Sequence, residues 1–211
     1  GDWSSNVCSS DLPTAKFSIT ESGRKRVAVS QPTETWNKPW DGKWRVFTFD
    51  LPTSRRKERM VLWRELRTLK LGLLQRSVWV WPHPVEHLLT ATVEARGIPE
   101  CFCGFEVARL FLCDDAEVAS TAWDFERINQ AHETYRKHPV ATAASLPRAK
   151  DLREVGHLAR LEYDAYQHAF FLDPLLPRQL WPKSYRGGQT EERHQAFLAA
   201  LRIRIRELSH P

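Results

Sequence analysis

Alternating side chains mark residues 43–50 as a β-strand. Aromatic and β-branched residues interleave along this segment, and Pro52 closes it. A period of two is typical of a strand that packs at least one face against a core. Asp50 therefore lies at the carboxyl end of a predicted central strand. Its simplest structural role is that of a turn residue whose carboxylate caps nearby amides.

The period of the apolar residues changes after Pro52. Leucines now recur every three or four positions, which predicts a helix with one apolar stripe; they are Leu62, Leu66, Leu69 and Leu73. Basic residues fall mostly on the other side, namely Arg56, Lys57, Arg64, Arg67 and Lys70. A basic helix face is usually just the solvated one. A turn marked by Gly72 is predicted before the next strand.

Residues 77–81 predict a second strand with two apolar faces. Valines alternate with Trp79 and Trp81 in this segment, so other parts of the chain must cover at least one large aromatic face. A helix through Leu89 and a third strand over residues 100–107 follow. This order, with room for a short extra strand beside Gly72, fits a ferredoxin-like βαββαβ domain, which we place at residues 40–114.

The pattern is helical from residue 115 onward. Asp124 is placed to cap a helix that reaches His138, and two longer amphipathic helices are predicted over residues 151–172 and 190–208. A proline-rich apolar connection, residues 173–182, separates them. We therefore predict an α+β protein in which the central ferredoxin-like domain precedes a helical C-terminal domain at residues 115–211.

Composition narrows the class of protein without naming a function. The 211 residues are 42% apolar and include nine tryptophans, which is ample for packed cores. A net charge of +5 and a pI near 9.2 suit an anionic partner such as nucleic acid or an acyl-CoA. No apolar run approaches the ~18 residues of a membrane span, and no signal peptide is visible. We expect a cytoplasmic protein that binds no membrane and no cofactor.

Residues 83–87, HPVEH, match the zinc-binding pattern H-x-x-E-H. Pro84 argues against a metal site, because it pushes His83 out of the α region and makes Pro84 itself the first helical residue. His83 and His87 then do not share a helical face. Cys101 and Cys103 are interpreted as small core residues of a strand, since no second pair of ligands lies at zinc spacing. The four cysteines show no disulfide framework, and no metal ion is expected.

The first 39 residues divide into two segments. Residues 1–12 are interpreted as an artefact, because residues 2–12 resemble a translated sequencing adaptor, or as a disordered serine-rich tail. Residues 13–39 hold a short strand, a glycine and a linker, and resemble the wing strand of a winged-helix domain. The helices that enter the major groove are then expected to be missing upstream. The basic run of this remnant is expected to contact DNA phosphates, or to be only a basic linker; it consists of Arg24, Lys25 and Arg26.

Five motifs, in order along the chain, resemble the PaaX-type repressors of phenylacetic acid catabolism. They are WDGKWRVFTFDLP, the basic leucine-rich helix, GLLQRSVWVWP, AWDFERI and DPLLPRQLWP, and the last two are unusually specific. The resemblance covers residues 16–208. It implies a winged-helix DNA-binding domain, a central ferredoxin-like domain and a helical C-terminal domain. It also implies a homodimeric, non-enzymatic repressor that leaves its DNA operator when a phenylacetyl-CoA-like aryl-acyl-CoA binds; the residues identify no pocket for this effector.

The central domain also resembles the small ferredoxin-like nuclease of CRISPR adaptation, which supplies an alternative function. That resemblance implies that Asp50 holds a metal ion across a dimer interface. One carboxylate per chain supplies few metal ligands, whereas phosphodiester hydrolysis usually needs several oxygen ligands to hold a divalent ion. About a hundred residues beyond the ferredoxin-like unit also exceed what a standalone nuclease needs. We therefore favour the repressor, with no catalytic residue.

Overall fold

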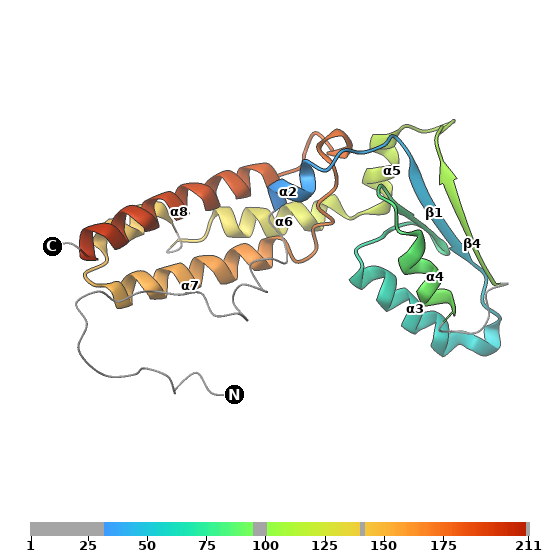
Figure 1. Cartoon of the computed structure of the whole chain (residues 1–211), viewed down its shortest axis with the longest axis horizontal. Helices are drawn as coiled ribbons and strands as arrows, with labels where there is room; N and C mark the ends of the chain where they lie inside the picture. Colours follow the sequence, from blue (N-terminus) through green and yellow to red (C-terminus); the bar gives the residue numbers. More distant parts are fainter. Residues whose placement is uncertain (1–31, 95–100, 140–141, 210–211) are drawn as a thin grey trace.

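A four-stranded antiparallel sheet forms the centre of the first half of the chain (Figure 1). The computed structural model describes residues 32–94, 101–139 and 142–209. The strands are β1 (Trp44–Phe49), β2 (Gly72–Gln75), β3 (Val78–Trp81) and β4 (Phe102–Val107), in spatial order β2-β3-β1-β4. Helices α3 (Arg56–Thr68) and α4 (Glu86–Glu94) cover one face. This element order and the antiparallel pairing of β1 with both β3 and β4 confirm the predicted ferredoxin-like topology.

Helix α3 ends earlier than the leucine spacing predicts. Leu62 and Leu66 are fully buried, but the helix stops at Thr68, and Leu73 lies in β2 rather than on the helical stripe. The residue that turns the chain is Lys70, with φ of 63°. The amides of Lys70 and Leu71 donate to the carbonyls of Arg67 and Leu66, as in a Schellman cap. A lysine therefore occupies the left-handed position that glycine usually fills.

Gly72 is required for packing and not for the turn. It is the first residue of β2, and a Cβ at this position would lie 2.7 Å from both the Cβ of Ala122 and a ring carbon of Trp123. Only a glycine lets the β2 backbone approach helix α5 (Asp115–Ala122) this closely. The prediction that Gly72 marks the turn is therefore wrong by one to three residues, because the turn lies at Leu69–Leu71.

Apolar cores lie on both faces of the sheet, as the sequence of β3 predicts. Trp79 and Phe47 pack beneath α3 and α4, while Trp44 and Val80 pack on the opposite face. The second core is completed by residues from far along the chain: Val118, Ala119, Ala122, Trp123, Phe125, Ile128, Leu176 and Leu180. Removing a buried tryptophan such as Trp79 costs about 3–5 kcal/mol. The C-terminal region is thus an integral cover of the sheet.

The C-terminal region is helical. Helices α6 (Phe125–Arg136), α7 (Leu152–Ala169) and α8 (Gly187–Ser209) lie side by side in a bundle (Figure 1). Short 3-10 turns lie at Thr53–Arg55, Ala143–Arg148 and Arg178–Leu180. The side chains of Asp114, Asp124 and Asp151 cap helices α5, α6 and α7, which confirms the predicted cap at Asp124. Among the described residues, none of the helices has the length and apolar character needed to cross a membrane.

Three local predictions are corrected. Residues 32–36, predicted as linker, form helix α2 (Pro32–Trp36), and Trp36 is buried. Helix α4 begins at Glu86 and not at Pro84, although His83 still precedes it and shares no helical face with His87. Cys103 is exposed on the edge strand β4 and is not a core residue, because the core on its face of the sheet extends only to Val107 at the other end of the strand.

Candidate functional site

The two most specific motifs of the sequence meet where the sheet joins the helical bundle. Residues 122–128 contribute Trp123 and Phe125, and residues 173–182 contribute Leu176 and Leu180, to a single apolar core. We call this region the junction. It brings together segments that lie about fifty residues apart in the sequence, which local sequence reasoning does not reveal.

Lys70 connects the sheet to the bundle at the junction. Its ammonium donates hydrogen bonds to the carbonyl oxygens of Asp173, at 2.7 Å, and Phe170, at 3.3 Å, just past the end of α7. Its own carbonyl accepts a 2.9 Å hydrogen bond from the Trp123 indole. A cation near a helix C-terminus also complements the helix dipole. Burial lowers the pKa of Lys70, and the nearby Asp173 carboxylate opposes this shift.

The Asp173 carboxylate is buried and fully engaged. Its Oδ2 accepts a 2.6 Å hydrogen bond from the Tyr185 hydroxyl and lies 2.7 Å from His132 Nε2. Its Oδ1 accepts a 2.8 Å hydrogen bond from the Leu175 amide. Burial and the Asp173 charge together raise the pKa of the Tyr185 phenol. A carboxylate this deep in the protein depends on such partners, because burying an unpaired charge is very unfavourable.

A second polar layer lies between α6, α7 and α8. The Tyr135 hydroxyl donates a 2.5 Å hydrogen bond to Glu162, and His194 Nδ1 lies 2.8 Å from the same oxygen. The Tyr166 hydroxyl donates to Glu191. Burial first, and then the adjacent carboxylate, raises the pKa of each of these tyrosines. A fully satisfied buried network fixes the register of the helices that contribute to it.

These residue types also occur in catalytic sites, but their placement indicates a structural role. A general base must come within hydrogen-bond reach of its substrate. His132, Asp173 and Glu162 are exposed by 1% or less, so a reactant has no access to them in this conformation. The junction therefore holds the sheet and the bundle in one relative position.

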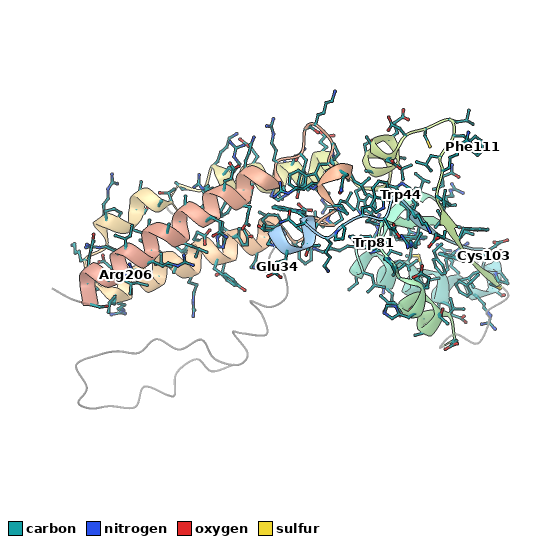
Figure 2. All side chains as sticks on the ribbon, turned by 45° about the horizontal axis from the view of Figure 1, so that its top comes forward. Glu34, Trp44, Trp81, Cys103, Phe111 and Arg206 are labelled. Atoms are coloured by element: carbon teal, nitrogen blue, oxygen red, sulfur yellow. The ribbon has the colours of Figure 1, made fainter. Side chains whose placement is uncertain are left out.

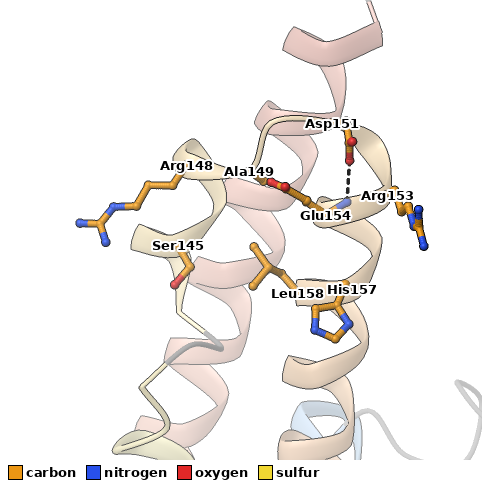
Figure 3. Close-up of a pocket in the computed structure, with 8 residues that line it drawn as sticks. All are labelled: Ser145, Arg148, Ala149, Asp151, Arg153, Glu154, His157 and Leu158. Carbon is orange, nitrogen blue, oxygen red and sulfur yellow. Dashed lines mark hydrogen bonds between the residues drawn. The ribbon is translucent and has the colours of Figure 1, made fainter.

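An open cavity of about 690 Å³ lies at the far end of the bundle, beside the start of α7 (Figure 3). Its volume falls in the range of small-molecule sites. The carboxylates of Asp151 and Glu154 accept hydrogen bonds from backbone amides at the helix start. Figure 3 shows that Arg148 and Arg153 extend away from the cavity on opposite sides. The cavity therefore lacks a converging set of polar groups, and the junction is the stronger candidate.

Asp50 lies directly after β1 with an exposed side chain. Its amide donates to the Cys101 carbonyl at 3.0 Å, but its carboxylate forms no hydrogen bond with a described residue. The predicted amide cap is therefore not formed by this part of the chain. Across the described residues there is also no group of three histidine, cysteine, aspartate or glutamate side chains suited to a metal ion.

The predicted DNA-contacting residues Arg24, Lys25 and Arg26 lie outside the described residues, as does the proposed wing strand. Their role stays a prediction. None of them is placed by the structure relative to the junction or to Asp50.

Sequence reasoning does not select Lys70, His132, Glu162 or Asp173 as site residues. One signal was available for two of them. His132 lies on the same face of its helix as Ile128 and Tyr135, and Glu162 lies among the apolar positions of α7. A polar residue on an apolar stripe indicates a buried partner, although the pattern does not say where in the sequence that partner lies.

Comparison with known proteins identifies the sheet domain. A solved structure, "Uncharacterized protein Rv0674 from Mycobacterium tuberculosis", matches with a TM-score of 0.55 and 19% sequence identity, over 89% of this chain and 71% of that chain. At this identity the likeness shows the fold alone. None of the curated proteins matches the chain. Residues 37–119 match the family model "PaaX protein central Cas2-like domain", so the chain contains a PaaX-type central Cas2-like domain.

Proposed function

We propose that the protein is a PaaX-type transcriptional regulator, a repressor that leaves its DNA operator when an aryl-acyl-CoA binds. The observation that carries this proposal is the match of residues 37–119 to the PaaX central domain. DNA reading is assigned to a winged-helix domain of which residues 13–39 are the remnant, with Arg24, Lys25 and Arg26 on DNA phosphates.

Helix α2 supports a physical link between the N-terminal segment and the bundle. Trp36 is 2% exposed, and its ring packs against Phe170, Trp181 and Tyr185 at centroid distances of 5.9, 5.0 and 6.3 Å. Tyr185 in turn donates to Asp173. The chain that leads to the DNA-reading segment is thus anchored on the junction. An effector that rearranges the junction on binding would therefore also move the N-terminal segment.

The outer edge of the sheet supports the homodimer. β4 is an edge strand, which leaves one row of its backbone groups unpaired in the described chain. Phe105 on β4 is 52% exposed, and Phe111 and Leu112 just beyond it are 78% and 97% exposed. Figure 2 shows Phe111 and Cys103 at this outer side of the molecule. A second copy of the chain that pairs there would cover apolar surface that a monomer leaves in water.

The test begins with the gene. Sequencing upstream of the Pro13 codon should reveal an in-frame run encoding two or three amphipathic helices. The extended chain should then shift a fragment of its own promoter in a gel, and phenylacetyl-CoA should release that fragment whereas free CoA should not. Light scattering on the same sample should give the mass of a dimer. In a Phe105→Glu variant the measured mass should fall toward that of a monomer. The proposal would be overturned if the gene has a start codon near Pro13 and the protein translated from that codon does not bind DNA.

A further inference from the structure

Helix α3 carries four exposed basic side chains in one sector. Arg56, Lys57, Arg64 and Arg67 are all exposed. With 3.6 residues per turn they fall within a sector of about 100°, opposite the buried Leu62. They form two lines along the helix, because Arg56 lies at nearly the same angle around the axis as Arg67, and Lys57 at nearly the same angle as Arg64. Along the axis, Arg56 and Arg67 are about 16 Å apart and Lys57 and Arg64 about 10 Å apart. We call these four residues the α3 basic row.

No acidic side chain neutralises the α3 basic row among the described residues. Glu58 lies outside this sector and pairs with Arg55 at 3.0 Å. Glu65 projects almost opposite Arg56 and Arg67 by the same helical geometry. None of the four forms a salt bridge with a described carboxylate, although ion pairs are common elsewhere on this surface. The charges of the row therefore remain available to an external anion.

One member of the row is held in place before any partner binds. The Arg67 guanidinium lies 4.3 Å from the centre of the Trp63 ring, and Trp63 packs edge-on against Trp79 at 5.4 Å. Trp79 is fully buried. A cation–π contact uses the face of the guanidinium and leaves its N–H groups free to donate. Arg67 is thus preorganised to donate hydrogen bonds to a phosphate.

We propose that the α3 basic row binds the sugar-phosphate backbone of duplex DNA, so that the central domain adds a sequence-independent contact to the reading domain. The choice of DNA among polyanions rests on the proposed function. A lipid surface fits less well, because the apolar stripe of α3 is buried against the sheet and is not free to enter a membrane. Basic side chains spread along one helix can contact several phosphates, and such contacts position a protein without selecting a sequence.

The test uses the full 211-residue chain and a fluorescein-labelled duplex of arbitrary sequence. Anisotropy titrations between 50 and 200 mM salt compare three proteins. The first is the parent, and the second carries R56Q, K57Q, R64Q and R67Q. The third carries R127Q, R153Q, R202Q and R206Q, which removes the same charge from exposed positions on other helices. Each is measured again with R24Q, K25Q and R26Q added, which separates the row from the predicted N-terminal contacts.

The row variant is expected to weaken binding tenfold or more at 50 mM salt, whereas the matched control stays within twofold of the parent. With R24Q, K25Q and R26Q present, the slope of log K against log salt should be about −3, for three to four phosphates contacted by the row, and clearly flatter when the four row substitutions are added. If the row variant and the matched control lose the same DNA affinity, the loss is explained by net charge alone, and the proposal is overturned. A loss confined to the Arg24–Arg26 substitutions, or binding to anionic vesicles and not to DNA, would also overturn it. None of these outcomes depends on an operator or an effector, so the proposed function is tested separately.

Discussion

The ammonium of Lys70 lies 2.7 Å from the carbonyl oxygen of Asp173, although 103 residues separate the two in the sequence. Lys70 reaches it from the left-handed position that ends α3, a conformation that costs a residue with a Cβ about 1–2 kcal/mol. Glycine would avoid this cost but would supply no ammonium. The contact therefore joins the end of a helix in the sheet domain to the end of a helix in the bundle.

Replacing Lys70 by Met should destabilise the protein by about 1–3 kcal/mol, because buried carbonyls lose their donor. Urea unfolding followed by tryptophan fluorescence and by circular dichroism measures this. Lys70→Gly loses the same hydrogen bonds but relieves the left-handed backbone, so it should be about 1 kcal/mol less destabilising than Lys70→Met. Lys57→Met, at an exposed position of α3, is the control. Equal stability of Lys70→Met and the parent would show that the contact contributes nothing.

Gly72→Ala should destabilise the protein by about 1–3 kcal/mol through overpacking, since the new methyl group would meet Ala122 and Trp123. Gly156 provides the matched control. It lies within α7, with nothing near the position of an added Cβ, so Gly156→Ala should stabilise the protein by about 0.5–1 kcal/mol. Thermal melting of both variants checks the pair, and a stabilising Gly72→Ala would contradict the close approach of β2 to α5.

Lys70 and Gly72 also show which features of the structure the sequence predicts and which it does not. Alternation and leucine spacing predict the strands and α3 because these patterns are local and repeat within one element. The spacing does not reveal that Lys70 ends the helix, because a left-handed lysine has no local signal. The sequence pattern likewise assigns Gly72 to a turn, because the pattern does not show that Trp123 packs against Gly72. The Lys70–Asp173 contact is unpredictable for the same reason: each partner is an ordinary surface-type residue until the fold brings the two together.

Trp181→Ala should cost about 2–3 kcal/mol, less than the 3–5 kcal/mol of a fully buried tryptophan. The ring is only half-buried, but it packs against Trp36 and Tyr185, and its N–H donates a 2.9 Å hydrogen bond to the Leu176 carbonyl. Trp181→Phe keeps most of the ring contact and should lose about 1 kcal/mol. Urea unfolding ranks the two variants, and an unchanged midpoint for Trp181→Ala would contradict the role of this ring at the junction.

Asp50→Asn should leave the behaviour of the protein toward DNA unchanged. The Asp50 carboxylate is exposed, and phosphodiester hydrolysis needs several oxygen ligands to hold a divalent ion and orient water. Supercoiled plasmid incubated with the parent chain and Mg²⁺ or Mn²⁺ should remain intact on a gel. Cleavage by the parent that disappears in Asp50→Asn would establish the nuclease alternative and reject a purely regulatory protein.

Stability should fall steeply above pH 10. Burial and neighbouring carboxylates raise the pKa values of Tyr135, Tyr166 and Tyr185, whereas a tyrosine in the unfolded chain ionises near its ordinary pKa of about 10. Above that pH the unfolded state binds fewer protons than the folded state, so each phenol lowers the free energy of unfolding by about 1.4 kcal/mol per pH unit. Below pH 10 their contribution is fully present and constant. Lys70 acts with the opposite sign because burial lowers its pKa, but one ammonium does not offset three phenols.

Urea midpoints measured from pH 8 to pH 11.5 test this dependence. The double variant Tyr135→Phe, Tyr166→Phe removes two of the three phenols and should flatten the decline above pH 10, even though it lowers stability at pH 8 by leaving Glu162 and Glu191 without these donors. Tyr163→Phe, at a half-buried position whose hydroxyl has no hydrogen-bond partner among the described residues, should keep the parent profile. A decline that is equally steep in the double variant would mean that the buried phenols do not control the alkaline transition, and that charge repulsion elsewhere in the chain does.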